Sequence, residues 1–211
     1  MVPGGYRDRV AAHTQQRYQV RFGWGAAGAA RIAPGTHLLV WIDVLPDAGA
    51  RDAGARQRAL RSLAARLPEG PEVVLGHLGN AAAVAERVSR LQAGRGDRCV
   101  VAIVAAGHHH APGDDAAEDA GETADVPDAP DFAVEDLLAA GAVVDALAEV
   151  GIDHTSPEAA AACAAYTGLR RAVKHLVSAS EAAAALEPAE VHAALAVDGA
   201  LTTLRESSPR A

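Results

Sequence analysis

The chain has 211 residues and a formal net charge of −8; half of its residues are hydrophobic but only 3% are aromatic. That length suffices for one α/β domain with a core built from Ala, Val and Leu. An acidic surface repels phosphate backbones and few aromatic rings could stack on bases, which excludes nucleic acid as the main partner. Neither a membrane span nor a signal peptide is evident, so we expect a cytoplasmic protein.

Strand-like and helix-like segments alternate in the first half of the chain. Residues 1–17 are polar and predict a flexible N-terminal arm ahead of a single α/β domain over residues 18–211. Apolar segments with β-branched residues predict buried strands, and helical patterns between them predict a mainly parallel sheet covered by helices. The expected strands are 18–22, 37–45, 72–76 and 99–106, and the main intervening helices are 50–67 and the segment from Asn80, as N-cap, to Gly94.

The segment 108–131 differs from the rest of the chain. It is rich in Pro, Gly and acidic residues and has almost no apolar side chains, which predicts a flexible surface loop. His108, His109 and His110 open this segment and could bind a transition metal. Consecutive residues rarely converge on one ion, so a solvated loop is the simpler interpretation.

A helical pattern runs from Val134 to the end of the chain and predicts a helical C-terminal third. Capping residues divide it into four helices. The expected boundaries are Gly151, Ser156 with Pro157, Gly168, a capping box from Ser178 to Glu181, and Pro188.

The segment Gly23–Gly28 (GWGAAG) matches the glycine pattern of a dinucleotide-binding turn, and Asp43 lies where a ribose-binding acid would be. The helical pattern after Gly28 has barely two turns before Pro34, which is short for a dinucleotide-binding crossover. The pattern is also weak in a chain with 20 glycines. We therefore favour a turn in which small residues allow close packing.

Three carboxylates are candidate site residues. Asp43 follows a buried strand, where open α/β sheets place functional groups, and it either holds Mg²⁺ or caps a turn. Glu135 and Asp136 lie in the first turn of a predicted helix, where interaction with the helix dipole, worth about 0.3–1 kcal/mol, explains both without a ligand. Because adjacent helical residues point about 100° apart, we expect one to face a pocket and favour Glu135.

His77 and Asn80 flank the turn after the third expected strand. Together with the following helix N-terminus they could bind an anion. The alternative is a turn in which Asn80 only caps the helix, a position that Asn favours.

Three segments taken together resemble a known family. They are VRFGWGAAGAARIAPG followed by VWIDVL, then 99–107 followed by 132–147, and the tail 191–204. They resemble the 2-phosphosulpholactate phosphatase family, Mg²⁺-dependent enzymes linked to coenzyme M biosynthesis, and are most similar to its divergent actinobacterial branch. The resemblance implies that Asp43, Glu135 and Asp136 hold Mg²⁺ and that Asp43 and Glu135 are catalytic.

Two turns depart from the family pattern. Pro46-Asp47-Ala48 stands where the family has an Arg or Ser and a Thr-rich helix start, and Gly79-Asn80-Ala81 replaces an Asn-Gly-Ser/Thr turn. Two functions therefore stay open. The first is a Mg²⁺-dependent phosphatase of a small phosphorylated acid, with His77 and Asn80 binding the substrate. The second is a catalytically degenerate homologue that acts as a binding or assembly protein, for instance as a homo-oligomer through its Ala-rich helices.

Overall fold

The computed structural model describes residues 15–46, 53–108 and 130–208. Five strands form one sheet in the order β1-β4-β2-β3-β5, in which the first four are parallel and β5 is antiparallel to β3. The mainly parallel α/β sheet expected from the sequence is thus confirmed. The strands are β1 (Val20–Trp24), β2 (Leu38–Ile42), β3 (Glu72–Gly76), β4 (Val101–Ala105) and β5 (Thr202–Arg205).

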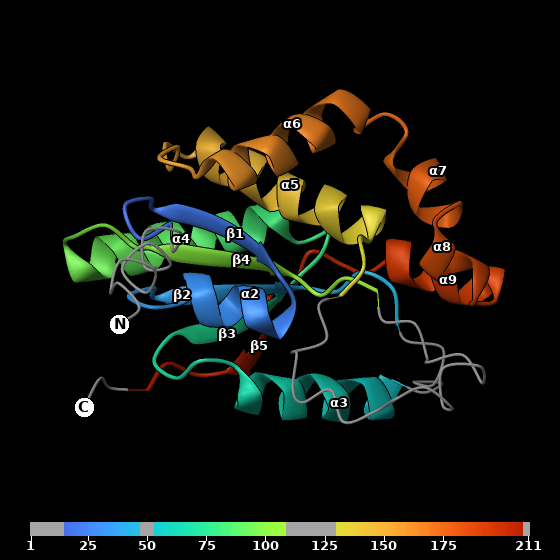
Figure 1. The fold of residues 1–211 in the computed structure, drawn as a ribbon, viewed down its shortest axis with the longest axis horizontal. Helices are drawn as coiled ribbons and strands as arrows, with labels where there is room; N and C mark the ends of the chain where they lie inside the picture. The colour runs from blue at the N-terminus through green and yellow to red at the C-terminus, as the bar shows by residue number, and fades with distance from the viewer. Residues whose placement is uncertain (1–14, 47–52, 109–129, 209–211) are drawn as a thin grey trace, which may run out of the picture.

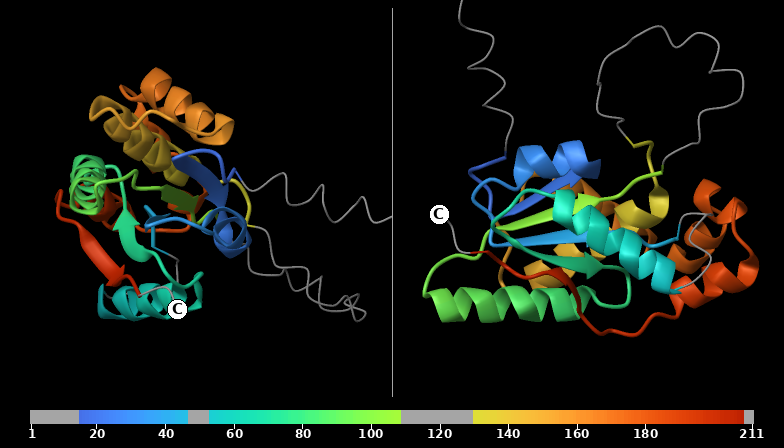
Figure 2. Two further views of the ribbon diagram at one scale, coloured as in Figure 1. Left: turned by 90° about the vertical axis from the view of Figure 1, so that its left-hand side faces the viewer. Right: turned by 90° about the horizontal axis from the view of Figure 1, so that it is seen from below.

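Helices cover both faces of this sheet (Figures 1 and 2). On one face lie α2 (Gly25–Ile32) and α3 (Ala53–Arg66), and on the other lie α4 (Ala81–Arg95) and α5 (Val134–Glu149). An outer helix packs on α5, and three short helices follow it before the chain returns to the sheet as β5. These outer helices are α6 (Pro157–Leu169), α7 (Val173–Ser178), α8 (Glu181–Ala184) and α9 (Pro188–Leu195).

The continuous apolar runs of the central strands divide between two cores. Leu38, Val40 and Ile42 of β2 pack with α4 and α5, whereas Leu39 and Trp41 pack with α2 and α3. Successive side chains of a strand point to opposite faces, so a strand buried on both sides needs no polar position. All five residues of β2 and of β4 are buried.

Two close contacts depend on glycine. A Cβ atom at Gly141 of α5 would clash with the carbonyl oxygen of Ala162 and lie 2.7 Å from Cβ of Tyr166, so glycine lets α5 and α6 approach each other. A Cβ atom at Gly28 would lie 3.1 Å from the carbonyl carbon of Gly23, where α2 packs on β1. Close packing therefore accounts for Gly23 and Gly28 of the dinucleotide-like pattern, as favoured from the sequence, but the two residues lie in β1 and α2 and not in a turn.

The edge of β1 that does not pair with β4 is covered by the side chain of Gln15 and by the loop 154–156. The Gln15 amide pairs with Phe22, donating from Nε2 to the carbonyl oxygen at 2.8 Å and accepting from the backbone N–H at 3.0 Å. The carbonyl of His154 accepts from the N–H of Val20, and the N–H of Ser156 donates to the Val20 carbonyl. Gln15 was expected in the flexible arm, but these contacts hold it against the sheet.

Several helix boundaries follow the sequence signals. Ser156 caps α6 through its side chain with Pro157 at the first helical position, and Pro188 begins α9. Gly151 has a positive φ of 81° directly after α5, the left-handed conformation that glycine tolerates at a helix end.

Other boundary predictions were wrong. Helix α4 continues through Gly94 and ends at Gly96, which has the left-handed conformation. Helix α6 includes Gly168 and ends one residue later. Ser178 ends α7 instead of starting a helix, and Ser180 is the N-cap of α8. The C-terminal third is also not helical to its end, because β5 adds an edge strand.

Some expectations concern residues outside the described ranges. They are the arm over residues 1–14, and residues 109–129 of the acidic segment, with His109 and His110. The ends of that segment are described: His108 and Asp131 exchange two backbone hydrogen bonds of 2.8 and 3.1 Å. Across the described ranges, no helix has the length and apolar character to cross a membrane.

Candidate functional site

The carboxyl ends of the parallel strands bring the first polar residues after β2 and β3 together. Ile42 and Gly76 are register partners, so Asp43 and His77, the next residues of each strand, are neighbours across the sheet edge. Adjacent strands lie about 4.8 Å apart, close enough for these side chains to act on one ligand. Open α/β sheets bind ligands at this edge.

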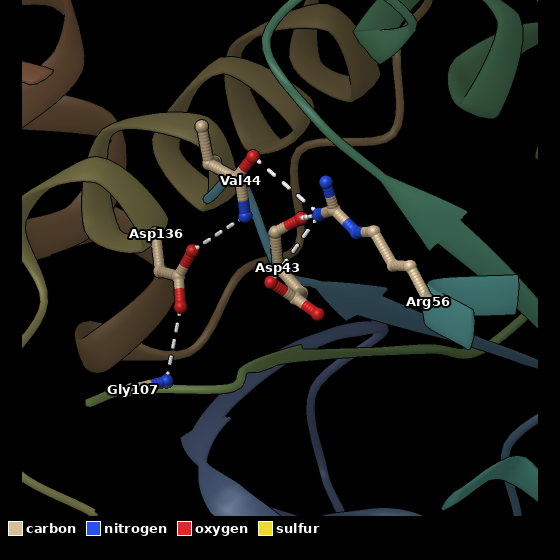
Figure 3. Close-up of polar contacts among 5 residues, drawn as sticks. All are labelled: Asp43, Val44, Arg56, Gly107 and Asp136. Atoms are coloured by element: carbon tan, nitrogen blue, oxygen red, sulfur yellow. Dashed lines mark hydrogen bonds and ion pairs between the residues drawn. The ribbon is translucent and has the colours of Figure 1, made fainter. Parts of the chain in front are cut away.

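Asp136 connects α5 to two of these strand ends (Figure 3). Its Oδ1 accepts a 2.9 Å hydrogen bond from the N–H of Val44, and its Oδ2 accepts one of the same length from the N–H of Gly107. The side chain lies deep, with the residue 3% exposed. Both carboxylate oxygens therefore hold the backbone that follows β2 and β4, and Asp136 is the member of the acidic pair that faces the strand ends, not the favoured Glu135.

The electrostatic surroundings of Asp136 oppose its ionisation. Burial and then the negative charge of Asp43 raise the pKa of Asp136 well above its ordinary value, and Glu135 adds to this effect. The two backbone N–H groups act in the opposite direction because they stabilise the carboxylate. This crowding of negative charge suits a place where a cation or a cationic side chain approaches.

Glu135 is as buried as Asp136, but its carboxylate does not bind backbone N–H groups in the described structure. The residue is 3% exposed, and within the described ranges its carboxylate has no hydrogen bond or ion pair. Its oxygens are not among the described side-chain atoms that are both buried and unpaired, so they reach solvent. Glu135 thus has unused capacity to bind a cation or a donor.

Arg56 of α3 supplies a positive charge that the sequence did not reveal (Figure 3). Its Nη2 donates to the carbonyl oxygen of Asp43 at 2.8 Å and lies 3.5 Å from Oδ1 of Asp43. The Nε atom is buried and has no hydrogen-bond partner in the described structure. In Figure 3, Arg56 approaches Asp43 from the side opposite to Asp136. A cation, a carboxylate and unused N–H donors therefore meet after β2.

The turn after β3 fixes His77 through its backbone and its ring. Asn80 accepts from the N–H of His77 at 2.9 Å and donates to the carbonyl oxygen of Leu75 at 2.9 Å. The N–H of Gly79 donates to Nδ1 of His77 at 3.2 Å. Asn80 occupies the N-cap position of α4 but makes no side-chain capping bond, which corrects the capping alternative. Its amide instead shapes the turn that carries His77.

The ring of His77 is held in its neutral form. Burial, followed by the positive charge of Arg56, lowers the pKa of His77 below its ordinary 6.5, and Asp198 acts in the opposite direction. The residue is 8% exposed. Because Nδ1 accepts a hydrogen bond, the neutral ring carries its proton on Nε2 and can donate it to an anion.

The donor set permits a limited metal assignment. Mg²⁺ prefers oxygen ligands and is commonly held by one or two carboxylates, waters and substrate phosphate. Asp43 and Glu135 fit this description, whereas Asp136 already directs both oxygens at backbone N–H groups. Among the described residues, no three His, Cys, Asp or Glu side chains form a group that could hold a metal by themselves. Such a site would need the ligand's own oxygens.

The structure brings together several of the residues expected from the sequence. Asp43, His77, Asn80 and Asp136 come from separate segments and lie at one edge of the sheet. Arg56 was missed because its helix carries several arginines and nothing in the pattern marks the one that reaches Asp43. Asp198 lies in the tail 191–204 that carries the family resemblance, but nothing in the sequence marks it as a site residue.

The comparison with known families agrees with these observations. The model of the 2-phosphosulpholactate phosphatase family matches residues 59–198, about two-thirds of the chain. The chain therefore belongs to a family of phosphatases, the 2-phosphosulpholactate phosphatase family. The matched range contains His77, Asn80, Glu135, Asp136 and Asp198, while Asp43 and Arg56 precede it. No curated protein matches the chain.

Proposed function

We propose that this protein is a Mg²⁺-dependent phosphatase of a small phosphorylated acid. The corner formed by Asp43, Arg56 and His77 is the place where the phosphoryl group binds. Family membership supports phosphatase chemistry in general, and the position of Arg56 supports this chain's own version of it.

The single observation that carries the proposal is the guanidinium of Arg56 beside Asp43, with its buried Nε unbonded in the described structure. Phosphoryl transfer needs positive charge and donors around the transferring oxygens. A planar guanidinium suits this task because it offers several donors in a fixed geometry. Arg56 supplies from α3 the charge that the turn at Pro46 lacks.

Two carboxylates are assigned the metal role. Asp43 and Glu135 would hold Mg²⁺, which when bound would polarise the phosphoryl group. Asp136 would act as a positioning residue, because it ties the segments after β2 and β4 to the start of α5. Asp136, which the sequence suggested as a Mg²⁺ ligand, would therefore shape the site and not bind the metal.

A catalytically degenerate homologue is the second candidate. The replaced hydroxyl at Ala81 and the commitment of Asp136 to backbone N–H groups favour it. Such a protein would still bind phosphate at Arg56 without hydrolysing a phosphate ester. Binding and turnover must therefore be measured separately.

The deciding experiment measures inorganic phosphate released from 2-phosphosulpholactate and from 2-phospholactate, with and without Mg²⁺. We expect Mg²⁺-dependent release by the wild-type protein and loss of release in Asp43→Asn. Asp97→Asn is the matched control, because Asp97 is exposed and precedes β4, at the opposite edge of the sheet. Binding of phosphate without release from either ester would reject the phosphatase proposal and support the degenerate homologue.

A further inference from the structure

The segment that links α9 to β5 lies against the turn after β3. A Cβ atom at Gly79 would lie 2.7 Å from the carbonyl oxygen of Val197 and 3.4 Å from Nδ1 of the His77 ring. A Cβ atom at Gly199 would lie 3.3 Å from the carbonyl oxygen of Gly79. Residues 197 and 199 thus both touch the turn, and Asp198 between them is carried to the same place.

Two hydrogen bonds fix this segment. Asn80, whose side chain is buried, donates from Nδ2 to the carbonyl oxygen of Ala200 at 3.4 Å as well as to Leu75. Oδ1 of Asp198 accepts from the N–H of Ala200 at 3.1 Å. Asn80 therefore connects two segments that are 120 residues apart: the turn that carries His77 and the turn that carries Asp198.

One ring nitrogen of His77 accepts a hydrogen bond, and the other has no described partner. The N–H of Gly79 occupies Nδ1, and no described residue hydrogen-bonds to Nε2 although the residue is only 8% exposed. Among the described residues, the side-chain atoms that are both buried and unpaired are Trp41 Nε1 and Arg56 Nε, so Nε2 of His77 reaches solvent. An accessible N–H at the carboxyl edge of the sheet can donate to a ligand acceptor. The two described groups whose charges act on His77 have opposite signs: Arg56 from α3 and Asp198 from the segment before β5.

We propose that His77 donates its Nε2–H to an oxygen of the bound phosphoryl group and that Asp198 is the positioning residue that acts through His77. The proposal rests on the proposed function, since it takes the ligand to be a phosphate. Arg56 and His77 then hold the same anion from α3 and from the turn after β3. Asp198 accepts from the N–H of Ala200, whose carbonyl oxygen binds Asn80, and so supports the turn that carries His77.

The test uses the whole chain labelled with ¹⁵N in its histidines, with inorganic phosphate as the probe. The ring signals of His77 are assigned by their loss in His77→Gln. We expect the Nε2–H tautomer in the free protein and a change of the Nε2–H signal when phosphate saturates the site. Asp198→Asn should lower the pKa of His77. Asp198→Ala, which removes the acceptor of the Ala200 N–H, should weaken phosphate binding. The matched control, Glu149→Gln, changes an exposed carboxylate at the far end of α5 and should alter neither.

Separate outcomes contradict separate steps. An Nδ1–H tautomer, or phosphate binding that leaves the His77 signals unchanged, would overturn the donor role while leaving the proposed function intact. Unchanged phosphate binding in Asp198→Ala would overturn the role of Asp198. No phosphate binding, with or without Mg²⁺, would instead reject the proposed function on which the inference rests.

Discussion

Asp136 and Val44 are 92 residues apart in the sequence and joined by a 2.9 Å hydrogen bond from the Val44 N–H to a buried carboxylate oxygen. The second oxygen of Asp136 binds the N–H of Gly107 in the same way. One side chain therefore sets the spacing between the segments that leave β2 and β4. It also fixes the first turn of α5, and hence Glu135, relative to Asp43.

Asp136→Asn should destabilise the fold. An amide keeps one acceptor oxygen and turns its NH₂ toward the other backbone N–H, which leaves a buried donor unsatisfied at a cost of about 1–3 kcal/mol. Chemical unfolding of the two proteins at one pH measures this difference. Glu149→Gln, an exposed change on the same helix, should stay within about 0.5 kcal/mol of the wild type. Equal stability of Asp136→Asn and wild type would contradict the expectation that the lost hydrogen bond outweighs the relief of repulsion from Asp43 and Glu135.

Two Gly→Ala substitutions inside helices should change the stability of the protein in opposite directions. Gly141→Ala should destabilise the protein by about 1–3 kcal/mol, because its Cβ meets the carbonyl of Ala162 and the Cβ of Tyr166. Gly94→Ala should stabilise it by about 0.5–1 kcal/mol, because Gly94 lies inside α4 with open space around its Cβ position. Thermal unfolding of both variants checks the signs; two changes of the same sign would contradict the account.

The edge of β1 should depend on Gln15. Removing its amide in Gln15→Ala leaves the Phe22 N–H without its 3.0 Å acceptor. We expect the Phe22 amide to exchange with solvent about five- to tenfold faster, which corresponds to roughly 1 kcal/mol for one hydrogen bond. Gln16→Ala is the matched control, because Gln16 is exposed and only its backbone carbonyl is used, by Arg21. Unchanged exchange at Phe22 in Gln15→Ala would show that the edge is protected by other means.

The pKa of His77 predicts how stability depends on pH. The folded-state pKa lies below the ordinary 6.5, so the unfolded chain binds more protons than the native protein when the pH falls below that value. The stabilising contribution of neutral His77 is present above pH 6.5 and is lost as the pH falls through the folded-state pKa. The stability of wild type relative to His77→Gln should therefore decrease between about pH 7.5 and 5. A difference that stays constant, measured by urea unfolding, would contradict the lowered pKa.

The sequence predicted the parallel sheet because buried strands leave an unambiguous pattern. The run LLVWI of β2 and the run VAIVA of β4 have no polar position, and the structure buries every residue of both. β5 was missed because its sequence, TTLR, is short and mostly polar and has only one buried side chain. Such an edge strand is specified by its partner β3 and not by its own composition.

The residues of the candidate site that directly follow strands could be predicted from the sequence. Those whose positions depend on tertiary contacts could not. Asp43 and His77 could be placed because parallel strands end at the same edge of a sheet. The role of Asn80 was misjudged because an Asn side chain can bond back to its own turn as easily as cap a helix. Arg56 depends on the rotation of α3 about its axis, for which the sequence of that helix has no clear signal.

The measurement that tests the central claim most directly is calorimetric titration of inorganic phosphate, in the presence of Mg²⁺, into wild type, Arg56→Gln and Arg58→Gln. Arg58 is exposed on the same helix and serves as the matched charge control. We predict that Arg56→Gln weakens phosphate binding about 30-fold, the equivalent of roughly 2 kcal/mol for a charge-assisted hydrogen bond, and that Arg58→Gln has little effect. Equal phosphate affinity in wild type and Arg56→Gln would contradict the assignment of this corner as the phosphate site.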